Sequence, residues 1–268
     1  MNSLVTTDWL AAHLGDPDLV ILDASLAPPG NPADMRAEYE RRHLPGARFL
    51  DLAALKSAPS FAAAMRDLGM ANDSMIIVYD QTPLHSATRG WWLLRQHGAA
   101  RVSVLDGGLG KWLAEGRAVA SGPAQAHPAT FTGGRNAAAH VTKSDILAGL
   151  DLPLVDARDA ARFAGTSSDP RPGIADGHIP GACNLPFATL YQPDGTFKSL
   201  DAIRALFAAA GIDPARPFVA SCGSGVTATT LLFAAHLLGN DDAKLYEGSW
   251  TEWGADPATP KQLGVPTG

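Results

Sequence analysis

The sequence predicts an α/β protein made of two related halves, each a mainly parallel β-sheet flanked by helices on both faces. First, short apolar runs rich in Val, Ile and Leu alternate with longer helical patterns, which is typical of strands and helices arranged around a parallel sheet. Second, several motifs occur twice in the same order. Third, at a typical size of about 150 residues per domain, a length of 268 residues allows one large domain or two small ones, and each half has enough chain to bury a core of its own.

The repeat rests on four pairs of segments, and the offset between the copies stays between 133 and 142 residues. The pairs are LVILDAS at 19–25 with LPLVDAR at 152–158, HLPGA at 43–47 with HIPGA at 178–182, MIIVYD ending at Asp80 with PFVASC ending at Cys222, and DGG at 106–108 with EGS at 247–249. Such slow drift is expected when loops change length between two copies of one domain. We therefore expect a duplicated domain.

The elements follow in order. Strands are expected at the apolar runs 19–22, 75–79 and 101–105 of the first half and 153–156, 217–221 and 243–246 of the second. Helices are expected at 60–69, 86–98, 199–211 and 226–239, and each of these patterns ends in a glycine suited to a helix C-terminus. Residues 121–140 are rich in Gly, Pro, Ala and Ser, so we expect a linker there, between domains at 1–120 and 141–268.

Composition excludes several classes of function. The 21 basic and 27 acidic residues give a net charge of −6, and no run of Lys or Arg forms a stripe for nucleic acid. No apolar stretch approaches the ~18 residues of a membrane span, and the N-terminus lacks the pattern of a signal peptide. We expect a cytoplasmic protein with no nucleic-acid or membrane partner, whose two cysteines, Cys183 and Cys222, are reduced.

Cys222 stands where chemistry is expected. It ends an apolar strand, and a glycine-rich loop, Gly223 to Thr227, leads from it into a helical pattern. A tight loop before a helix N-terminus turns several backbone N–H groups toward one point, where an anionic sulfur is stabilised. Because the thiolate is the nucleophilic form of cysteine, the pattern indicates sulfur chemistry. The structural alternative is a small buried side chain, as for Cys183 in its apolar segment.

These motifs resemble a known family. The HxPGA motif in each half, CGSGVTA at 222–228 and EGSWTEW at 247–253 are similar to the tandem-domain rhodanese superfamily of sulfurtransferases, and the loop resembles its 3-mercaptopyruvate sulfurtransferase branch. The resemblance implies that Cys222 takes a sulfane sulfur from a donor, holds it as a persulfide and passes it to a thiol such as reduced thioredoxin, or to cyanide. The loop residues Gly223, Ser224, Gly225, Val226 and Thr227 would cradle that sulfur. The resemblance also implies a monomer.

Charge favours one donor. The resemblance implies that enzymes for the thiosulfate dianion carry basic residues directly after the cysteine, whereas Gly223 and Ser224 are uncharged here. A carboxylate such as that of 3-mercaptopyruvate needs only one or two guanidinium groups. Arg162 and Arg171 match the positions that bind the substrate in similar enzymes, although each can also be an ordinary surface arginine.

Proton transfer is open to two interpretations. By resemblance, Ser224 works with His43 and Asp34 of the first half as an acid/base group. The alternatives are that Ser224 is a turn residue and that His43 only orders its own turn, as its counterpart His178 does. Thr227 is more simply interpreted as the cap of the following helix.

Other classes find little support. A cysteine phosphatase needs an arginine six residues after the nucleophile, where the chain has Ala228. No metal-binding or nucleotide-binding motif occurs, so no cofactor is expected. In the first half Asp80 replaces the cysteine, and Gln81-Thr82-Pro83 replaces the glycine-rich loop, so that half is expected to be catalytically inactive. Thiosulfate as donor and a non-catalytic interaction module remain the alternatives.

Overall fold

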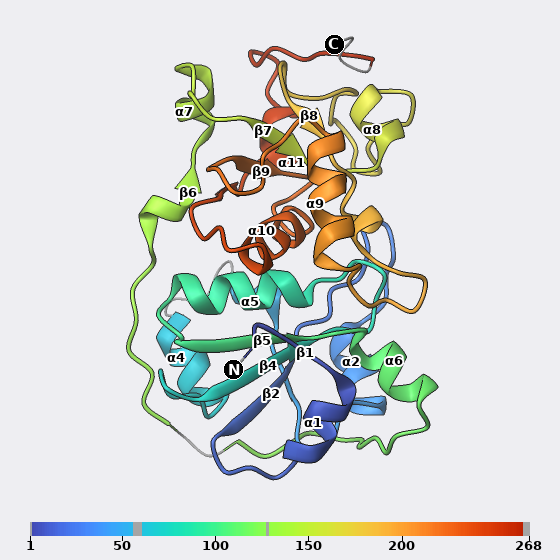
Figure 1. The fold of residues 1–268 in the computed structure, drawn as a ribbon, viewed down its shortest axis with the longest axis vertical. Helices are drawn as coiled ribbons and strands as arrows, with labels where there is room; N and C mark the ends of the chain where they lie inside the picture. The colour runs from blue at the N-terminus through green and yellow to red at the C-terminus, as the bar shows by residue number, and fades with distance from the viewer. Residues whose placement is uncertain (1, 56–60, 127–128, 265–268) are drawn as a thin grey trace. The chain divides into compact units, whose positions relative to one another are not determined.

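The structure is a computed structural model that describes residues 2–55, 61–126 and 129–264. The chain forms two compact units, the first spanning Met1–Asn136 with Pro193–Phe197 and the second Ala137–Gln192 with the chain from Lys198 onward. Each unit holds one five-stranded sheet whose described pairings are all parallel (Figure 1). The predicted fold class is confirmed.

In unit 1 the strand order is β1-β5-β4-β2-β3. The strands are β1 (Leu4–Val5), β2 (Leu19–Asp23), β3 (Arg48–Phe49), β4 (Met75–Tyr79) and β5 (Arg101–Leu105). The helices are α1 (Thr7–His13), α2 (Met35–Arg41), α3 (Leu52–Leu55), α4 (Phe61–Asp67), α5 (Ala87–Gln96) and α6 (Gly108–Ala114). The three runs predicted as strands are the three long strands, while β1 and β3 are two-residue strands at the sheet edges that periodicity over so few residues does not reveal.

Alternate residues of the unit 1 strands face opposite helices. Ile21 and Ile77 belong to a core cluster with Leu10 of α1, Tyr39 of α2 and Trp112 of α6. On the other face α5 approaches so closely that a Cβ at its Gly90 would lie 2.8 Å from Cγ1 of Val78. This two-residue alternation is why apolar side chains fill nearly every strand position.

Unit 2 repeats the arrangement with the order β6-β10-β9-β7-β8. Its strands are β6 (His140–Val141), β7 (Leu154–Asp156), β8 (Cys183–Asn184), β9 (Val219–Ser221) and β10 (Lys244–Tyr246). Its α-helices are α7 (Lys143–Leu147), α8 (Ala160–Ala164), α9 (Leu200–Ala209), α10 (Ala228–Leu237) and α11 (Ser249–Trp253), and the 3-10 helices are η1 (Ala137–Ala139) and η2 (Phe187–Leu190). One core cluster joins Val219 of β9 to Phe163 of α8 and to Trp250 and Trp253 of α11.

The glycines that were expected to end helices do so. α4, α5, α9 and α10 each stop two residues before a glycine in the left-handed region, with φ between 68° and 97° at Gly69, Gly98, Gly211 and Gly239. Few other residue types adopt that conformation at low cost. The helix predictions are therefore confirmed together with their physical reason.

The HxPGA motif has the same local role in each unit. His43 forms an isolated antiparallel bridge with Ala120, and His178 forms one with Gln262. Each bridge ties the motif to the segment that follows the last helix of its own unit. The duplication seen in the sequence thus extends to backbone contacts outside the sheets.

The described residues of the segment 121–140 are irregular up to η1, and one of their side chains is buried. Phe131 is buried and lies near Phe61, with ring centroids 6.2 Å apart. The backbone of Thr132 and the side chain of Asn72 exchange hydrogen bonds. Residues up to Asn136 accordingly cluster with unit 1.

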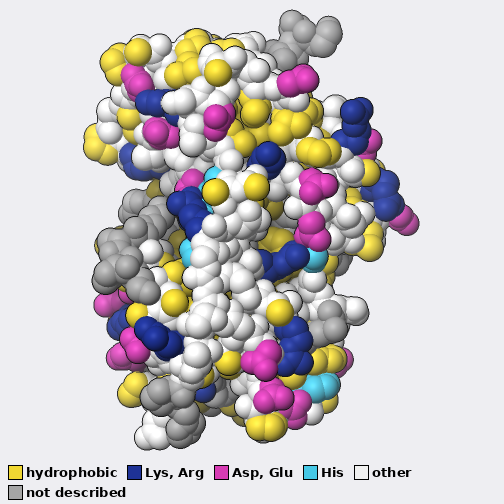
Figure 2. Space-filling view, turned by 90° about the vertical axis from the view of Figure 1, so that its left-hand side faces the viewer, with side chains coloured by type: hydrophobic (Ala, Val, Ile, Leu, Met, Phe, Trp, Pro, Cys, Tyr) yellow, Lys and Arg dark blue, Asp and Glu magenta, His cyan; other side chains and the backbone are white. Residues whose placement is uncertain are grey.

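No helix in the described part of the chain is long and apolar enough to cross a membrane. On the face shown in Figure 2, basic and acidic side chains lie interspersed in small groups, without a continuous basic stripe.

Candidate active site

Cys222 lies at the carboxyl end of β9, one residue beyond the strand, with its side chain buried. Its backbone is held on both sides, because Cys222 N–H donates to Ser249 Oγ at 3.1 Å and Trp250 N–H donates to the Cys222 carbonyl at 2.9 Å. Ser249 Oγ also lies 4.0 Å from Sγ. Ligand sites of parallel sheets occur at this end of the strands.

The loop from Gly223 to Thr227 joins Cys222 to α10, and Gly225 is the position that requires glycine. Its φ is +74°, and a Cβ there would lie 2.6 Å from the Glu247 carbonyl oxygen. Val226 and Thr227 are buried, and their carbonyls accept from the N–H groups of Thr229 and Thr230. The loop is therefore a rigid turn in front of a helix N-terminus.

Two arginines meet this loop. A Cβ placed on Gly223 would lie 3.0 Å from Nη2 of Arg171 and 3.1 Å from Nη2 of Arg162, so the missing side chain makes room for both groups. Arg171 Nη1 donates to the Gly223 carbonyl at 3.1 Å and also contacts the Thr251 hydroxyl. The two arginines selected from the sequence thus lie together beside the residue that follows Cys222.

A buried carboxylate holds the pair. Asp169, whose side chain is 1% exposed, accepts Arg171 Nε on Oδ1 at 2.7 Å and Arg171 Nη2 on Oδ2 at 2.6 Å. Its Oδ2 also accepts Arg162 Nη2 at 3.0 Å. Burial by itself raises the pKa of Asp169, but the hydrogen bonds from Arg171 and the charges of both arginines outweigh it and lower that pKa to about 2.

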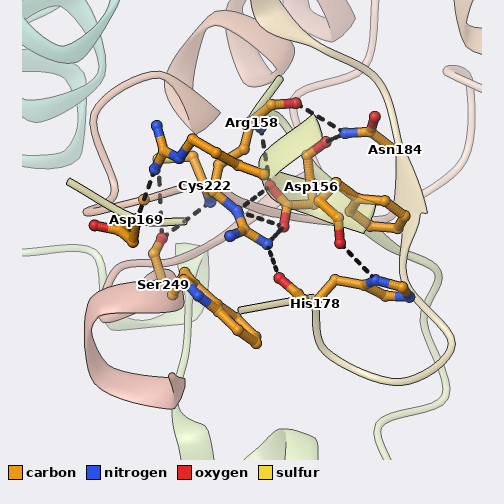
Figure 3. A network of polar contacts seen from close by, with 12 residues as sticks. Asp156, Arg158, Asp169, His178, Asn184, Cys222 and Ser249 are labelled. Atoms are coloured by element: carbon orange, nitrogen blue, oxygen red, sulfur yellow. Dashed lines mark hydrogen bonds and ion pairs between the residues drawn. The ribbon is translucent and has the colours of Figure 1, made fainter. Parts of the chain in front are cut away.

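A second buried ion pair supports the site. Arg158 pairs with Asp156, the last residue of β7, through Nη2 and Oδ2 at 2.7 Å, and its guanidinium lies 4.5 Å from the ring centroid of Trp250. Asn184 donates to the carbonyls of both Asp156 and Arg158 (Figure 3). Because Trp250 N–H binds the Cys222 carbonyl, this network also holds the backbone of the cysteine.

Ser224 and Thr227, two hydroxyl residues of the loop, differ in burial and position. Ser224 is half-buried, and its hydroxyl has no hydrogen-bond partner within the described residues. Thr227 is the N-cap residue of α10, as predicted, but its side chain forms no capping hydrogen bond. The physical reason is its helical backbone, φ −71° and ψ −18°, whereas a capping side chain needs an extended one.

His43 and Asp34 both lie in unit 1, and each is engaged locally. His43 is buried, its Nδ1 donates to the Tyr39 carbonyl at 2.9 Å and its ring stacks on Tyr39. Asp34 caps α2 by accepting from the backbone of Arg36 and Ala37. Across the described ranges the two side chains share no hydrogen bond or ion pair. His178 in unit 2 has matching contacts with Phe163.

Asp80 of unit 1 occupies the position of Cys222. Its carbonyl accepts Leu109 N–H at 2.9 Å, as the Cys222 carbonyl accepts Trp250 N–H, and its carboxylate accepts Ala87 N–H at 2.7 Å where α5 begins. Burial raises the pKa of this carboxyl to about 7, opposed by the bond from Ala87 and assisted by the charge of Asp23. A carboxyl group therefore fills the place of the thiol.

Sequence reasoning missed Asp169, Ser249 and Thr251. A signal existed for Ser249, because the aligned residue of the first half is Gly108 and both have a positive φ, 51° and 53°. A serine held in a glycine conformation beside Cys222 indicates a functional constraint. Neither thiol, Cys183 nor Cys222, is in a disulfide. In the part of the chain that the structure describes, no cluster of His, Cys, Asp and Glu has the form of a metal site.

The fold and this loop define a protein of two related α/β domains, of which the second carries a buried cysteine in a glycine-rich loop. The chain matches the Rhodanese-like domain family twice, over residues 6–115 and 139–256, and therefore belongs to the rhodanese family.

Relatives with two different names match nearly the whole chain. It is 40% identical over 266 residues to 3-mercaptopyruvate sulfurtransferase of Escherichia coli K12, covering 94% of each chain. It is 39% identical to the protein of the same name from Homo sapiens, covering 94% of this chain and 92% of that one. Thiosulfate sulfurtransferase of Bos taurus is also 39% identical, with the same coverage. The crystal structure of SseA from Escherichia coli superposes with a TM-score of 0.83 and 37% identity, covering 93% of this chain and 99% of that one.

Proposed function

We propose that this protein is a 3-mercaptopyruvate sulfurtransferase. The observation that carries the proposal is the pair Arg162 and Arg171 beside Gly223, next to a buried cysteine in a rigid glycine-rich loop whose own residues bear no charge. Guanidinium groups bind carboxylates in a forked geometry, and the loop stabilises an anionic sulfur. The relatives named for this activity match nearly the whole chain.

The reaction uses Cys222 as nucleophile. Its thiolate attacks the thiol sulfur of 3-mercaptopyruvate, the carbon–sulfur bond breaks, and pyruvate leaves as its enolate. The thiol proton of the donor ends on the methyl carbon of pyruvate, and Cys222 is left as a persulfide. Backbone groups of Gly223 to Thr227 stabilise the charged terminal sulfur, while the arginines orient the carboxylate and the keto group.

The other participants follow from this chemistry. A thiol such as reduced thioredoxin, or cyanide in an assay, takes the outer sulfur from Cys222. Ser224, with His43 and Asp34, remains our proposal for the group that moves the proton.

We further propose a cytoplasmic monomer with an inactive domain at 1–120, a linker at 121–140 and a catalytic domain at 141–268. Asp80 at the position of Cys222 supports the assignment of the inactive domain.

Thiosulfate is the second candidate donor, because relatives of almost equal identity carry the name thiosulfate sulfurtransferase. Neither of the residues directly after Cys222, Gly223 and Ser224, is basic. This argues against thiosulfate, because the binding of a dianion is strengthened most by adjacent cations.

The test is the intact mass of the protein after brief exposure to either donor, with Cys222→Ser as control. We expect the unsubstituted protein to gain one sulfur atom, faster from 3-mercaptopyruvate, and the variant to gain none. Gain from thiosulfate alone would assign the other donor. No gain from either would favour an interaction module.

A further inference from the structure

Asp169 is a charge inside the substrate-binding cluster that the reaction itself does not use. It is the least exposed member, at 1%, while the side chains of Arg162 and Arg171 are 21% and 25% exposed. It contacts both guanidinium groups and lies with Cys222 and Ser249 in one polar network (Figure 3). A buried carboxylate between two cations acts on each of them with little screening by water.

The N–H groups of the two arginines are not equally occupied. Arg171 donates hydrogen bonds from Nε and Nη2 to Asp169. Its Nη1 donates to the Gly223 carbonyl and to the Thr251 hydroxyl. Arg162 gives only Nη2 to Asp169 at short distance, its Nη1 lies 3.8 Å from Asp159, and its buried Nε has no partner among the described residues. Arg171 is thus engaged with the loop, and Arg162 retains donors for a ligand.

The cluster has a net charge of one. Two guanidinium charges less the Asp169 carboxylate leave +1, and Asp159 counts for little because its side chain is 57% exposed. In magnitude, this charge of +1 equals the charge of one carboxylate, −1, and is half the charge of thiosulfate, −2. A site that neutralises its ligand binds it without leaving an unpaired buried charge.

We propose that Asp169 is a specificity-determining residue, which sets the charge of the cluster so that donors with a single negative charge are preferred over dianions. The inference rests on the proposed function for its donors. Asp169 acts through the arginines and touches no reacting atom, so it is a positioning residue. An uncharged residue in its place would leave +2 beside the loop and favour thiosulfate.

The experiment measures binding without turnover, by calorimetry on Cys222→Ser protein with 3-mercaptopyruvate and with thiosulfate as probes. We expect Cys222→Ser to bind 3-mercaptopyruvate at least as tightly as thiosulfate. Adding Asp169→Asn, which keeps the size and an acceptor oxygen, should shift the ratio of the two Kd values roughly tenfold or more toward thiosulfate. Asp169→Glu restores the charge and should stay within about threefold of the parent ratio.

Asp201→Asn is the matched control, because it removes the same charge from a side chain that is 94% exposed and forms an ion pair with Arg204 in its own helix. It should leave the ratio unchanged. A parent protein that prefers thiosulfate overturns the inference whether or not Asp169→Asn folds, and so does an unchanged ratio in a folded Asp169→Asn. If the Kd ratio shifts as expected while Cys222 takes no sulfur from 3-mercaptopyruvate, the proposed function fails and the selection of singly charged anions stands.

Discussion

Ser249 holds a backbone conformation that the other half of the molecule gives to a glycine. Its φ of 51° is rarely adopted by other residues and costs roughly 1–2 kcal/mol. In exchange, its hydroxyl accepts the N–H of Cys222, lies near Sγ, and donates to the Tyr246 carbonyl at 2.8 Å. Strain retained beside Cys222 indicates that the Ser249 hydroxyl is kept for its contacts with that cysteine.

Substitutions of Ser249 separate the strain from the hydroxyl. Ser249→Gly and Ser249→Ala both leave the buried Cys222 N–H without its acceptor, but only glycine relieves the strain, so it should be the more stable variant by about 1 kcal/mol. Both should lose roughly tenfold or more in kcat/KM. Urea unfolding and steady-state kinetics measure the two effects. Full activity in Ser249→Gly would deny the hydroxyl a role.

Asp80 predicts a pH dependence of stability in unit 1. Its pKa is raised by burial from 3.8 to about 7, so the folded state binds this proton more tightly than the unfolded state between these values. Its contribution to the free energy of unfolding is therefore present below about pH 4 and is lost as the pH rises through 7, by an amount of the order of 4 kcal/mol.

Asp80→Asn removes this titration. The variant should be more stable than the unsubstituted protein at pH 8 and should show little or no advantage at pH 4, as measured by urea unfolding at both values. The same difference in unfolding free energy at the two pH values would show that the Asp80 carboxyl keeps an ordinary pKa.

His43 and His178 form a natural pair for testing proton transfer. Both are buried and both donate Nδ1–H to a carbonyl at 2.9 Å, so their structural duties are alike. His43→Asn and His178→Asn should cost similar stability, about 1–2 kcal/mol. If His43 moves a proton, only His43→Asn lowers kcat and alters its pH profile; equal kcat values in the two variants would assign His43 to its turn alone.

The limits of sequence reasoning at this scale follow from distance along the chain. Cys222 and its loop are contiguous in the sequence, so their pattern predicts the site without knowledge of the fold. Asp169 is two residues from Arg171, but its bond to Arg162 and the bond of Arg171 to Thr251 depend on three separate segments folding together. Hydrogen bonds between segments leave no periodicity, and a carboxylate beside an arginine is common on surfaces.

At the scale of elements, the loop before α10 needs its two glycines for different reasons. Gly225 has φ +74° and faces the Glu247 carbonyl, which belongs to the backbone and cannot move aside. Gly223 has an ordinary φ, and the nearest atoms that a Cβ would meet there are the side-chain ends of Arg162 and Arg171 rather than backbone. One glycine therefore sets the shape of the loop, and the other sets the distance of the arginines.

Alanine distinguishes these roles. Gly225→Ala should cost about 2 kcal/mol or more of stability and reduce kcat/KM roughly a hundredfold, because the loop must shift. Gly223→Ala should cost less than about 1 kcal/mol and raise the KM for 3-mercaptopyruvate several-fold with little change in kcat. Thermal unfolding and donor titrations give both quantities. Similar losses in kcat for both variants would contradict the division of roles.

Predictability of elements depended on length. The helices α4, α5, α9 and α10 and the strands of three to five apolar residues were predicted, because each carries its own pattern. The helices α1 and α6, which also stop two residues before a glycine, lie outside the predicted ranges. The two-residue strands β1, β3, β6 and β8 were not predicted, since pairing with a neighbour defines them. Phe131 shows the same limit in the segment predicted as a linker, because its burial comes from contacts of unit 1.

At the scale of the whole molecule, duplication keeps the scaffold and changes the site. Both units have the same strand order and the same bridge from the histidine of the HxPGA motif. In both, a backbone N–H donates to the carbonyl at the cysteine position, from Leu109 to Asp80 in unit 1 and from Trp250 to Cys222 in unit 2. What differs is local: Asp80 for Cys222, Gly108 for Ser249, and a proline-containing loop for the glycine-rich one. A fold that tolerates this exchange holds its site in a few replaceable residues.

The duplication makes a prediction about what a thiol alone can do. In a Cys222→Ser background, Asp80→Cys places a thiol at the equivalent position of unit 1, but the loop that follows is Gln81-Thr82-Pro83, in which Pro83 lacks an N–H and no glycine allows a tight turn. Without N–H groups to stabilise its charged terminal sulfur, a persulfide at position 80 should lose that sulfur as fast as it forms. Intact mass after exposure to 3-mercaptopyruvate should show no added sulfur in this double variant, whereas the protein with Cys222 intact gains one atom. Stable sulfur on the thiol introduced at position 80 would show that the carboxyl of Asp80, rather than its loop, keeps the first domain inactive.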